Sequence, residues 1–124
     1  MTRDEMAARL AEMSELAMWE WRLHAFDGDR LTLIGGQDMD YAHFAEAYFG
    51  GVSYISCPLQ LKHPHFRLAT DHEFMRAALE AEVGRGAYVI AIDSATTASL
   101  ATTSLLVATS VEYKEELVQY TWGR

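Results

Sequence analysis

A chain of 124 residues, half of them hydrophobic and 23% charged, is long enough to bury one core without help from a metal or a disulfide. Ten lysines and arginines against 18 aspartates and glutamates give a formal net charge of −8, which repels phosphate backbones and anionic lipid. We therefore expect a partner other than nucleic acid or membrane, such as a basic protein or a small ligand.

The single cysteine, Cys57, cannot form an intramolecular disulfide and cannot by itself build a cysteine-based zinc site. The first residues are acidic and include no apolar leader, and no window approaches the ~18 apolar residues of a membrane span. These features predict a soluble, cytoplasmic protein, and no motif predicts a cofactor.

The chain begins with a capping box, in which the Thr2 hydroxyl and the Glu5 carboxylate satisfy each other's free backbone N–H groups. Apolar side chains then recur at helical spacing from Met6 to Ala17. The pattern predicts a helix over residues 3–16.

Next the hydrophobic period changes to two. Residues 19–26 and 30–34 alternate on either side of an Asp-Gly-Asp turn, which predicts a β-hairpin before Gly35 breaks the pattern. Further strands are expected over 41–49 and 52–57.

Two prolines, Pro58 and Pro64, interrupt the following stretch. Because proline cannot donate to a β-ladder, we expect residues 59–68 to form an edge strand or an extended excursion and not a central strand. A second capping box at 70–73 then predicts a helix over 71–83, stopped by two glycines.

The last third of the chain predicts strands again. Residues 87–92 have no polar face, which predicts a strand covered on both sides at the centre of the sheet. Residues 94–104 are small and polar, as in a loop or a short helix. Residues 105–113 and 117–122 alternate, so that 114–116 would close a final hairpin.

This order of elements lacks the regular βα alternation of parallel-sheet folds. We therefore predict an α+β fold: a mainly antiparallel sheet of about six to eight strands, with two helices (about 3–16 and 71–83) packed on one face. No linker divides the chain, so residues 1–124 should form a single domain.

A histidine-rich segment, residues 57–73, holds the most suggestive polar residues. The imidazoles of His63, His65 and His72, with the Asp71 carboxylate, are suitable ligands for zinc or iron. The alternative is a solvated loop followed by a helix cap. No metal site is therefore assigned from the sequence.

Cys57 can be read in two ways. A nearby histidine could make it a nucleophile, whereas a cysteine at the end of an apolar strand is commonly a small buried hydrophobe. As a candidate binding segment we select residues around it: Tyr54, Cys57, His63, His65 and Arg67.

Carboxylates elsewhere have similar alternatives. The pairs Asp27/Asp29 and Asp38/Asp40 resemble cation-binding pairs but lie at predicted turns. Glu46 is either an acid or base with a raised pKa in a pocket or an outward charge at a sheet edge.

The sequence contains no glycine-rich phosphate loop, no Gly-x-Ser-x-Gly and no His-Glu-x-x-His, so nucleotide-dependent, serine-hydrolase and zincin chemistry have no support. We predict a non-enzymatic, inhibitor- or immunity-like interaction module that binds a protein partner or a second copy of itself. The alternative is a metal-assisted or small-ligand-binding enzyme that uses His63, His65 and His72. Aromatic residues exposed together would mark a binding or dimer face.

Overall fold

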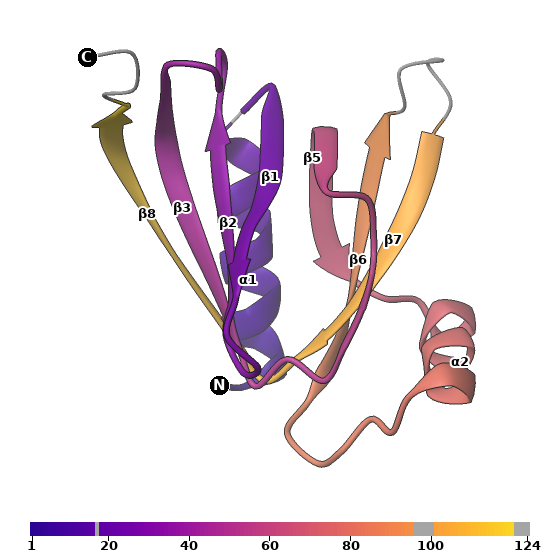
Figure 1. The fold of residues 1–124 in the computed structure, drawn as a ribbon. Helices are drawn as coiled ribbons and strands as arrows, with labels where there is room; N and C mark the ends of the chain where they lie inside the picture. Colours follow the sequence, from indigo (N-terminus) through magenta and orange to yellow (C-terminus); the bar gives the residue numbers. More distant parts are fainter. Residues whose placement is uncertain (17, 96–100, 121–124) are drawn as a thin grey trace.

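The computed structural model describes residues 1–16, 18–95 and 101–120, which form two helices and one sheet of eight strands (Figure 1). Every strand pair is antiparallel, and the strand order is β4-β7-β6-β5-β1-β2-β3-β8. The predicted α+β class and antiparallel sheet are therefore confirmed. The elements are α1 (Arg3–Glu15), β1 (Glu20–Phe26), β2 (Leu31–Gly36), β3 (Ala42–Gly50), β4 (Tyr54–Ser56), β5 (Gln60–Leu68), α2 (Asp71–Glu80), β6 (Tyr88–Ala95), β7 (Ala101–Ala108) and β8 (Ser110–Gln119).

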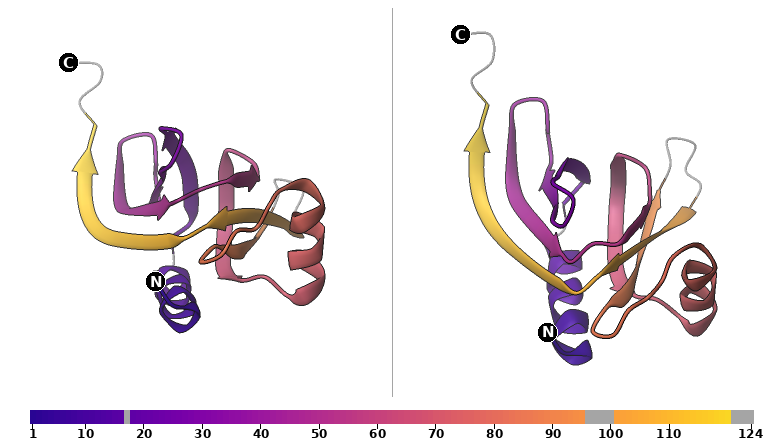
Figure 2. Two further views of the ribbon diagram at one scale, coloured as in Figure 1. Left: turned by 90° about the horizontal axis from the view of Figure 1, so that it is seen from below. Right: turned by 60° about the horizontal axis from the view of Figure 1, so that its bottom comes forward.

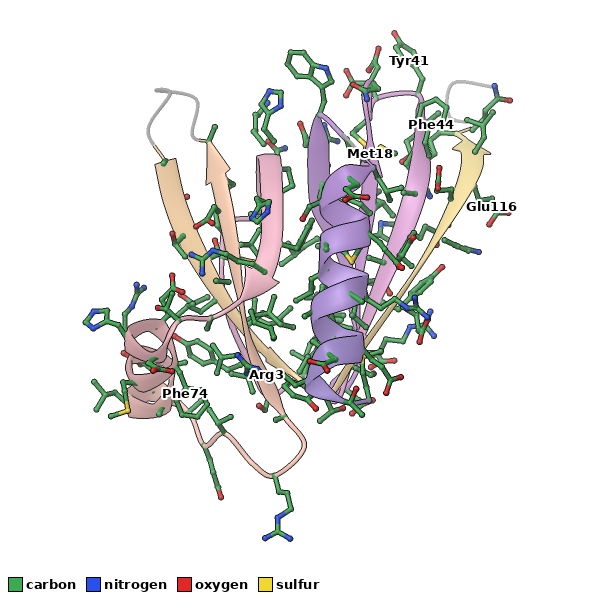
Figure 3. All side chains as sticks on the ribbon, turned by 180° about the vertical axis from the view of Figure 1, so that it is seen from behind. Arg3, Met18, Tyr41, Phe44, Phe74 and Glu116 are labelled. Atoms are coloured by element: carbon green, nitrogen blue, oxygen red, sulfur yellow. The ribbon has the colours of Figure 1, made fainter. Side chains whose placement is uncertain are left out.

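The first helix begins at the predicted capping box, with the Thr2 hydroxyl and the Glu5 carboxylate each accepting from the other's backbone N–H. It buries Met6, Leu10 and Met13, which lie on one helical face. Figure 3 shows α1 lying across the sheet. Neither described helix is long and apolar enough to span a bilayer. The residues buried with α1 are Trp21, Leu31, Leu33, Ala45, Ala47, Phe49, Val52, Leu61, Phe66, Ile90, Ile92, Leu106, Ala108 and Val111.

The second helix lies on the opposite face of the sheet. On β6, Ile90 and Ile92 belong to the core under α1, whereas Val89 and Ala91 pack with Ala77 of α2. Alternate residues of a strand point to opposite faces, so the two helices cover different sides, as Figure 2 also shows. The prediction of a strand covered on both sides is confirmed, but packing of both helices on one face is wrong because an apolar strand needs cover on each face.

The predicted helix over 71–83 is three residues too long. It begins as expected but ends at Glu80, because the backbone of Ala81 is extended. The extended chain lets Val83 pack against the cluster around Ala77. In a continued helix, Val83 would lie six residues after Ala77, which is not a whole number of helical turns. Its side chain would then point away from that cluster.

The prediction of an edge or excursion for residues 59–68 is wrong, because β5 lies between β1 and β6. Figure 1 shows β5 beside β6, and it pairs with β1 at its start and with β6 at its end. The ladder to β6 shifts register between Lys62 and His65, and His63 has a φ of 47°. Pro64 therefore sits in an irregularity, where its missing N–H costs no ladder bond.

The predicted hairpin around residues 114–116 is also wrong, because β8 runs through them as one strand. Lys114, Glu115 and Glu116 include no glycine, asparagine or proline to form a tight turn. The chain instead breaks at Thr109, whose N–H donates to the Gly50 carbonyl at 2.9 Å.

The predicted loop or helix over 94–104 is wrong at both flanks, because β6 extends to Ala95 and β7 begins at Ala101. Thr102 and Thr103 pair with β6, as suits β-branched residues. Residues 96–100, Ala17 and Trp122 lie outside the described residues.

Candidate functional site

The three histidines of the 57–73 segment do not converge. His63 is exposed at the irregularity of β5, with its ring 4.6 Å from that of Trp19. His65 is exposed opposite Asp93 in the ladder, and His72 is exposed in the first turn of α2. Within the described ranges, no three His, Cys, Asp or Glu side chains are grouped so that they could hold a metal ion.

Cys57 is partly buried, and burial raises the pKa of its thiol to about 11. A thiol with that pKa is protonated at neutral pH, whereas nucleophilic cysteines are activated by a lowered pKa. The surroundings therefore favour the interpretation of Cys57 as a small apolar side chain.

We expect Cys57 in the folded protein to react with iodoacetamide at pH 7.5 about 300-fold more slowly than free cysteine, because so little thiolate is present. Mass spectrometry of the alkylated protein measures this rate, and the same protein in denaturant is the control. Equal rates in the folded and unfolded states would contradict the raised pKa.

Arg67 is occupied by contacts within the fold. Its guanidinium donates to both carboxylate oxygens of Glu73 at 2.7 and 2.9 Å and to both of Asp93 at 2.7 and 3.1 Å. Asp93 also accepts from the Thr103 hydroxyl at 2.8 Å. We call Arg67, Glu73 and Asp93 the arginine clamp, because it ties α2 to β5 and β6. Tyr54 likewise packs against the α2 core.

One arm of the sheet has no described helix on the face opposite α1. On the β1-β2-β3-β8 arm, Arg22, Ile34, Glu46 and Lys114 stand in register in one row across the four strands. They alternate with residues buried under α1, and α2 lies at the other arm, where it contacts β5, β6 and β7. On this face the side chains of Arg22 and Lys114 are partly exposed, whereas Ile34 is buried.

A hydrogen-bonded group of ionisable side chains lies beside that row. The buried His43 contacts the Tyr120 hydroxyl at 2.7 Å through Nδ1 and Glu46 at 3.3 Å through Nε2. The Tyr48 hydroxyl donates to Glu46 at 2.7 Å. Although burial by itself acts in the other direction, the hydrogen bonds from Tyr48 and His43 lower the pKa of Glu46. Glu46 is thus an ionised hydrogen-bond acceptor. Its interpretation as an acid or base requires a raised pKa and is therefore wrong.

The aspartate pairs shape turns. One Asp27 oxygen accepts from the N–H groups of Asp29 at 3.0 Å and Arg30 at 2.8 Å, and these bonds lower its pKa. One Asp38 oxygen accepts from the N–H of Asp40 at 3.2 Å. These are the local bonds by which aspartate stabilises turns.

Three aromatic side chains are exposed at one end of the sheet. Trp19 immediately precedes β1, Tyr41 immediately precedes β3, and Phe44 lies just inside β3. Their exposed fractions are 59%, 70% and 41%. Figure 3 shows Tyr41 and Phe44 together at this end. We call these three residues the aromatic rim.

A pocket of about 470 Å³ opens beside the aromatic rim. Its Glu20 carboxylate is bound by Arg22 and lies 3.5 Å from the Lys62 ammonium. Three carboxylates and one guanidinium line it, so the pocket is acidic. The lining residues are Trp19, Glu20, Arg22, Gln37, Asp38, Met39 and Asp40.

The sequence marks the aromatic residues but not which of them are exposed, and it gives no sign that His43 meets Tyr120, 77 positions away. Within that group, Glu46 and Tyr48 are two positions apart in one strand, so alternation alone predicts that they lie on the same face. Comparison of the chain with models of known families, with curated proteins and with solved structures finds no match in any of the three.

Proposed function

We propose that the protein is an interaction module that binds a basic protein partner through the aromatic rim and the acidic pocket beside it. The observation that carries this proposal is the exposure of Trp19, which lines the pocket, together with that of Tyr41, which follows the lining residue Asp40 in the sequence. Tryptophan and tyrosine are the side chains that most often dominate binding energy at interfaces, because they bury large areas with few rotatable bonds.

The charge supports a basic partner. Asp38 lines the pocket and is exposed, and the whole chain carries a formal charge of −8. A partner of opposite charge is attracted over long range, and charged groups around an aromatic centre favour the correct partner over others.

The pocket lining supplies groups that recognise a cationic side chain. Its carboxylates can pair with lysine or arginine, and the indole of Trp19 can stack on a guanidinium or an ammonium group.

We expect Trp19→Ala combined with Tyr41→Ala to weaken partner binding about 100-fold, because two interface anchors are lost together. Affinity capture from a cell lysate at low and high salt identifies the partner, and calorimetry with the purified partner gives the dissociation constant.

The matched control is Phe26→Ala, which removes an aromatic ring that is 51% exposed at the other end of β1. It should leave the dissociation constant unchanged. A partner that binds the double variant as tightly as the unchanged chain would show that the aromatic rim is not the docking surface. An affinity insensitive to salt would show that the partner is not recognised by its positive charge.

A further inference from the structure

The two edges of the sheet are very different. The β4 edge is 3 residues long, whereas β8 at the other edge has 10 residues and is the longest strand. In the part of the chain that the structure describes, no strand pairs with the outer side of β8, which borders the sheet in Figure 2. Every second residue of such an edge presents its N–H and C=O outward, so β8 is a template for one more strand.

This edge is acidic. Glu112, Glu115 and Glu116 stand on β8 against a single basic residue, Lys114, which pairs with Glu116 at 2.7 Å. Arg9 of α1 lies 3.8 Å from Glu112, whose side chain is still largely exposed.

The edge also adjoins the aromatic rim. The ladder between β3 and β8 is irregular where Phe44 lies, between the pairs His43–Val118 and Ala45–Glu115. Leu117 is exposed at the same irregularity. A partner seated on the aromatic rim can therefore continue along β8.

We propose that β8 accepts an extended basic segment of the partner as an added strand. This inference rests on the proposed function and specifies the partner's chemistry. Backbone hydrogen bonds to β8 supply the affinity, and lysine or arginine side chains at alternate positions of the segment meet Glu112 on one face or Glu115 on the other.

A second copy of this chain is the less suitable occupant. Pairing two β8 strands would bring two sets of three glutamates together with only one lysine each, in chains that already repel one another. Charges on an edge strand commonly prevent self-association. The glutamates that repel a second β8 are those that attract a basic strand.

The test uses a labelled peptide of alternating lysine and valine, as long as β8 at 10 residues. Fluorescence anisotropy should show salt-sensitive binding, and a glutamate–valine peptide should not bind. A second lysine–valine peptide carries N-methyl groups on every other backbone nitrogen, which keeps its charge but removes the N–H donors along one edge. It should bind about tenfold or more weakly than the unmethylated peptide. Hydrogen exchange should slow at amides of residues 110–119 only.

On the protein, the triple variant Glu112→Gln, Glu115→Gln and Glu116→Gln should weaken binding of the peptide about tenfold. The control variant, Asp29→Asn, Glu80→Gln and Glu82→Gln, changes the net charge equally at exposed positions outside β8 and should weaken it much less.

Equal binding of the N-methylated peptide, equal weakening by both triple variants, or a dimer in light scattering that the peptide does not dissociate would each overturn strand addition. The Trp19→Ala/Tyr41→Ala variant keeps β8 and should bind the peptide almost unchanged. If the peptide binds but no partner depends on the aromatic rim, only the proposed function is rejected. If a partner is captured through the aromatic rim but the peptide does not bind, only strand addition is rejected.

Discussion

Replacing Arg67 by methionine should lower the free energy of unfolding by about 2–3 kcal/mol. The change removes the guanidinium of the arginine clamp and leaves the Glu73 and Asp93 carboxylates facing each other without a cation. Because α2 buries only Ala77 fully, the clamp is a large share of what holds this helix to the sheet. The estimate is at the lower end for broken ion pairs, since the Asp93 side chain is 40% exposed.

The clamp also predicts how stability depends on pH. Hydrogen bonds from Arg67 lower the pKa of Glu73 from 4.5 to about 2 and lower that of Asp93. A carboxyl with a lowered folded-state pKa stabilises the fold above its unfolded pKa and loses that stabilisation as the pH falls through the folded pKa. The unchanged chain should therefore lose stability between about pH 4.5 and 2, and Arg67→Met should lose less over this window.

Urea denaturation followed by circular dichroism at neutral and acidic pH measures both effects. Arg76→Met is the matched control, because Arg76 is an exposed residue of α2 that takes no part in the clamp. If the two variants unfold at the same urea concentration at neutral pH, the clamp contributes nothing to stability.

The helices were predictable because their starts are local. Thr2 with Glu5 and Thr70 with Glu73 satisfy each other within one helical turn, so sequence spacing alone identifies both starts. The end of α2 depends on Val83 reaching the cluster around Ala77, which is a tertiary contact. The sequence therefore placed that end too late.

The sheet was predictable in kind but not in order. Alternation indicates that a segment is a strand, but the neighbours of β5 depend on how the chain bends at Pro64, and local rules count that proline against an interior strand. In the same way, β8 alternates poorly near 114–116 because an edge strand tolerates charge on both faces.

The candidate site was harder to predict, because exposure is decided by where elements end. Trp19 and Trp21 share a period of two, yet Trp21 is 1% exposed and Trp19 is 59% exposed, since β1 begins only at Glu20. The clamp is equally hidden, because Arg67 and Asp93 are 26 positions apart. The sequence therefore places Arg67 in a candidate binding segment and gives no sign of its contacts with Glu73 and Asp93.

Gly35→Ala should destabilise the protein by about 3 kcal/mol, although alanine ordinarily suits a strand better than glycine. A Cβ at position 35 would lie 2.7 Å from Cδ2 of the Trp21 ring, well inside van der Waals contact. That ring is buried and packs edge-on against Phe66, with centroids 5.8 Å apart, so it has no room to withdraw. Gly35 is thus required because only a residue without a side chain fits against the Trp21 indole.

The matched variant Gly36→Ala separates this clash from the general effect of alanine in β2. Its nearest contacts are the Met39 sulfur at 2.8 Å, in a flexible side chain, and the His43 Cα at 3.3 Å, so we expect a smaller loss than for Gly35→Ala. Trp21→Leu destabilises by itself, but in combination with Gly35→Ala the total loss should fall short of the sum by about 1–2 kcal/mol, because the clash is then absent. Additive losses in urea denaturation would mean that Trp21 is not what excludes a side chain at position 35.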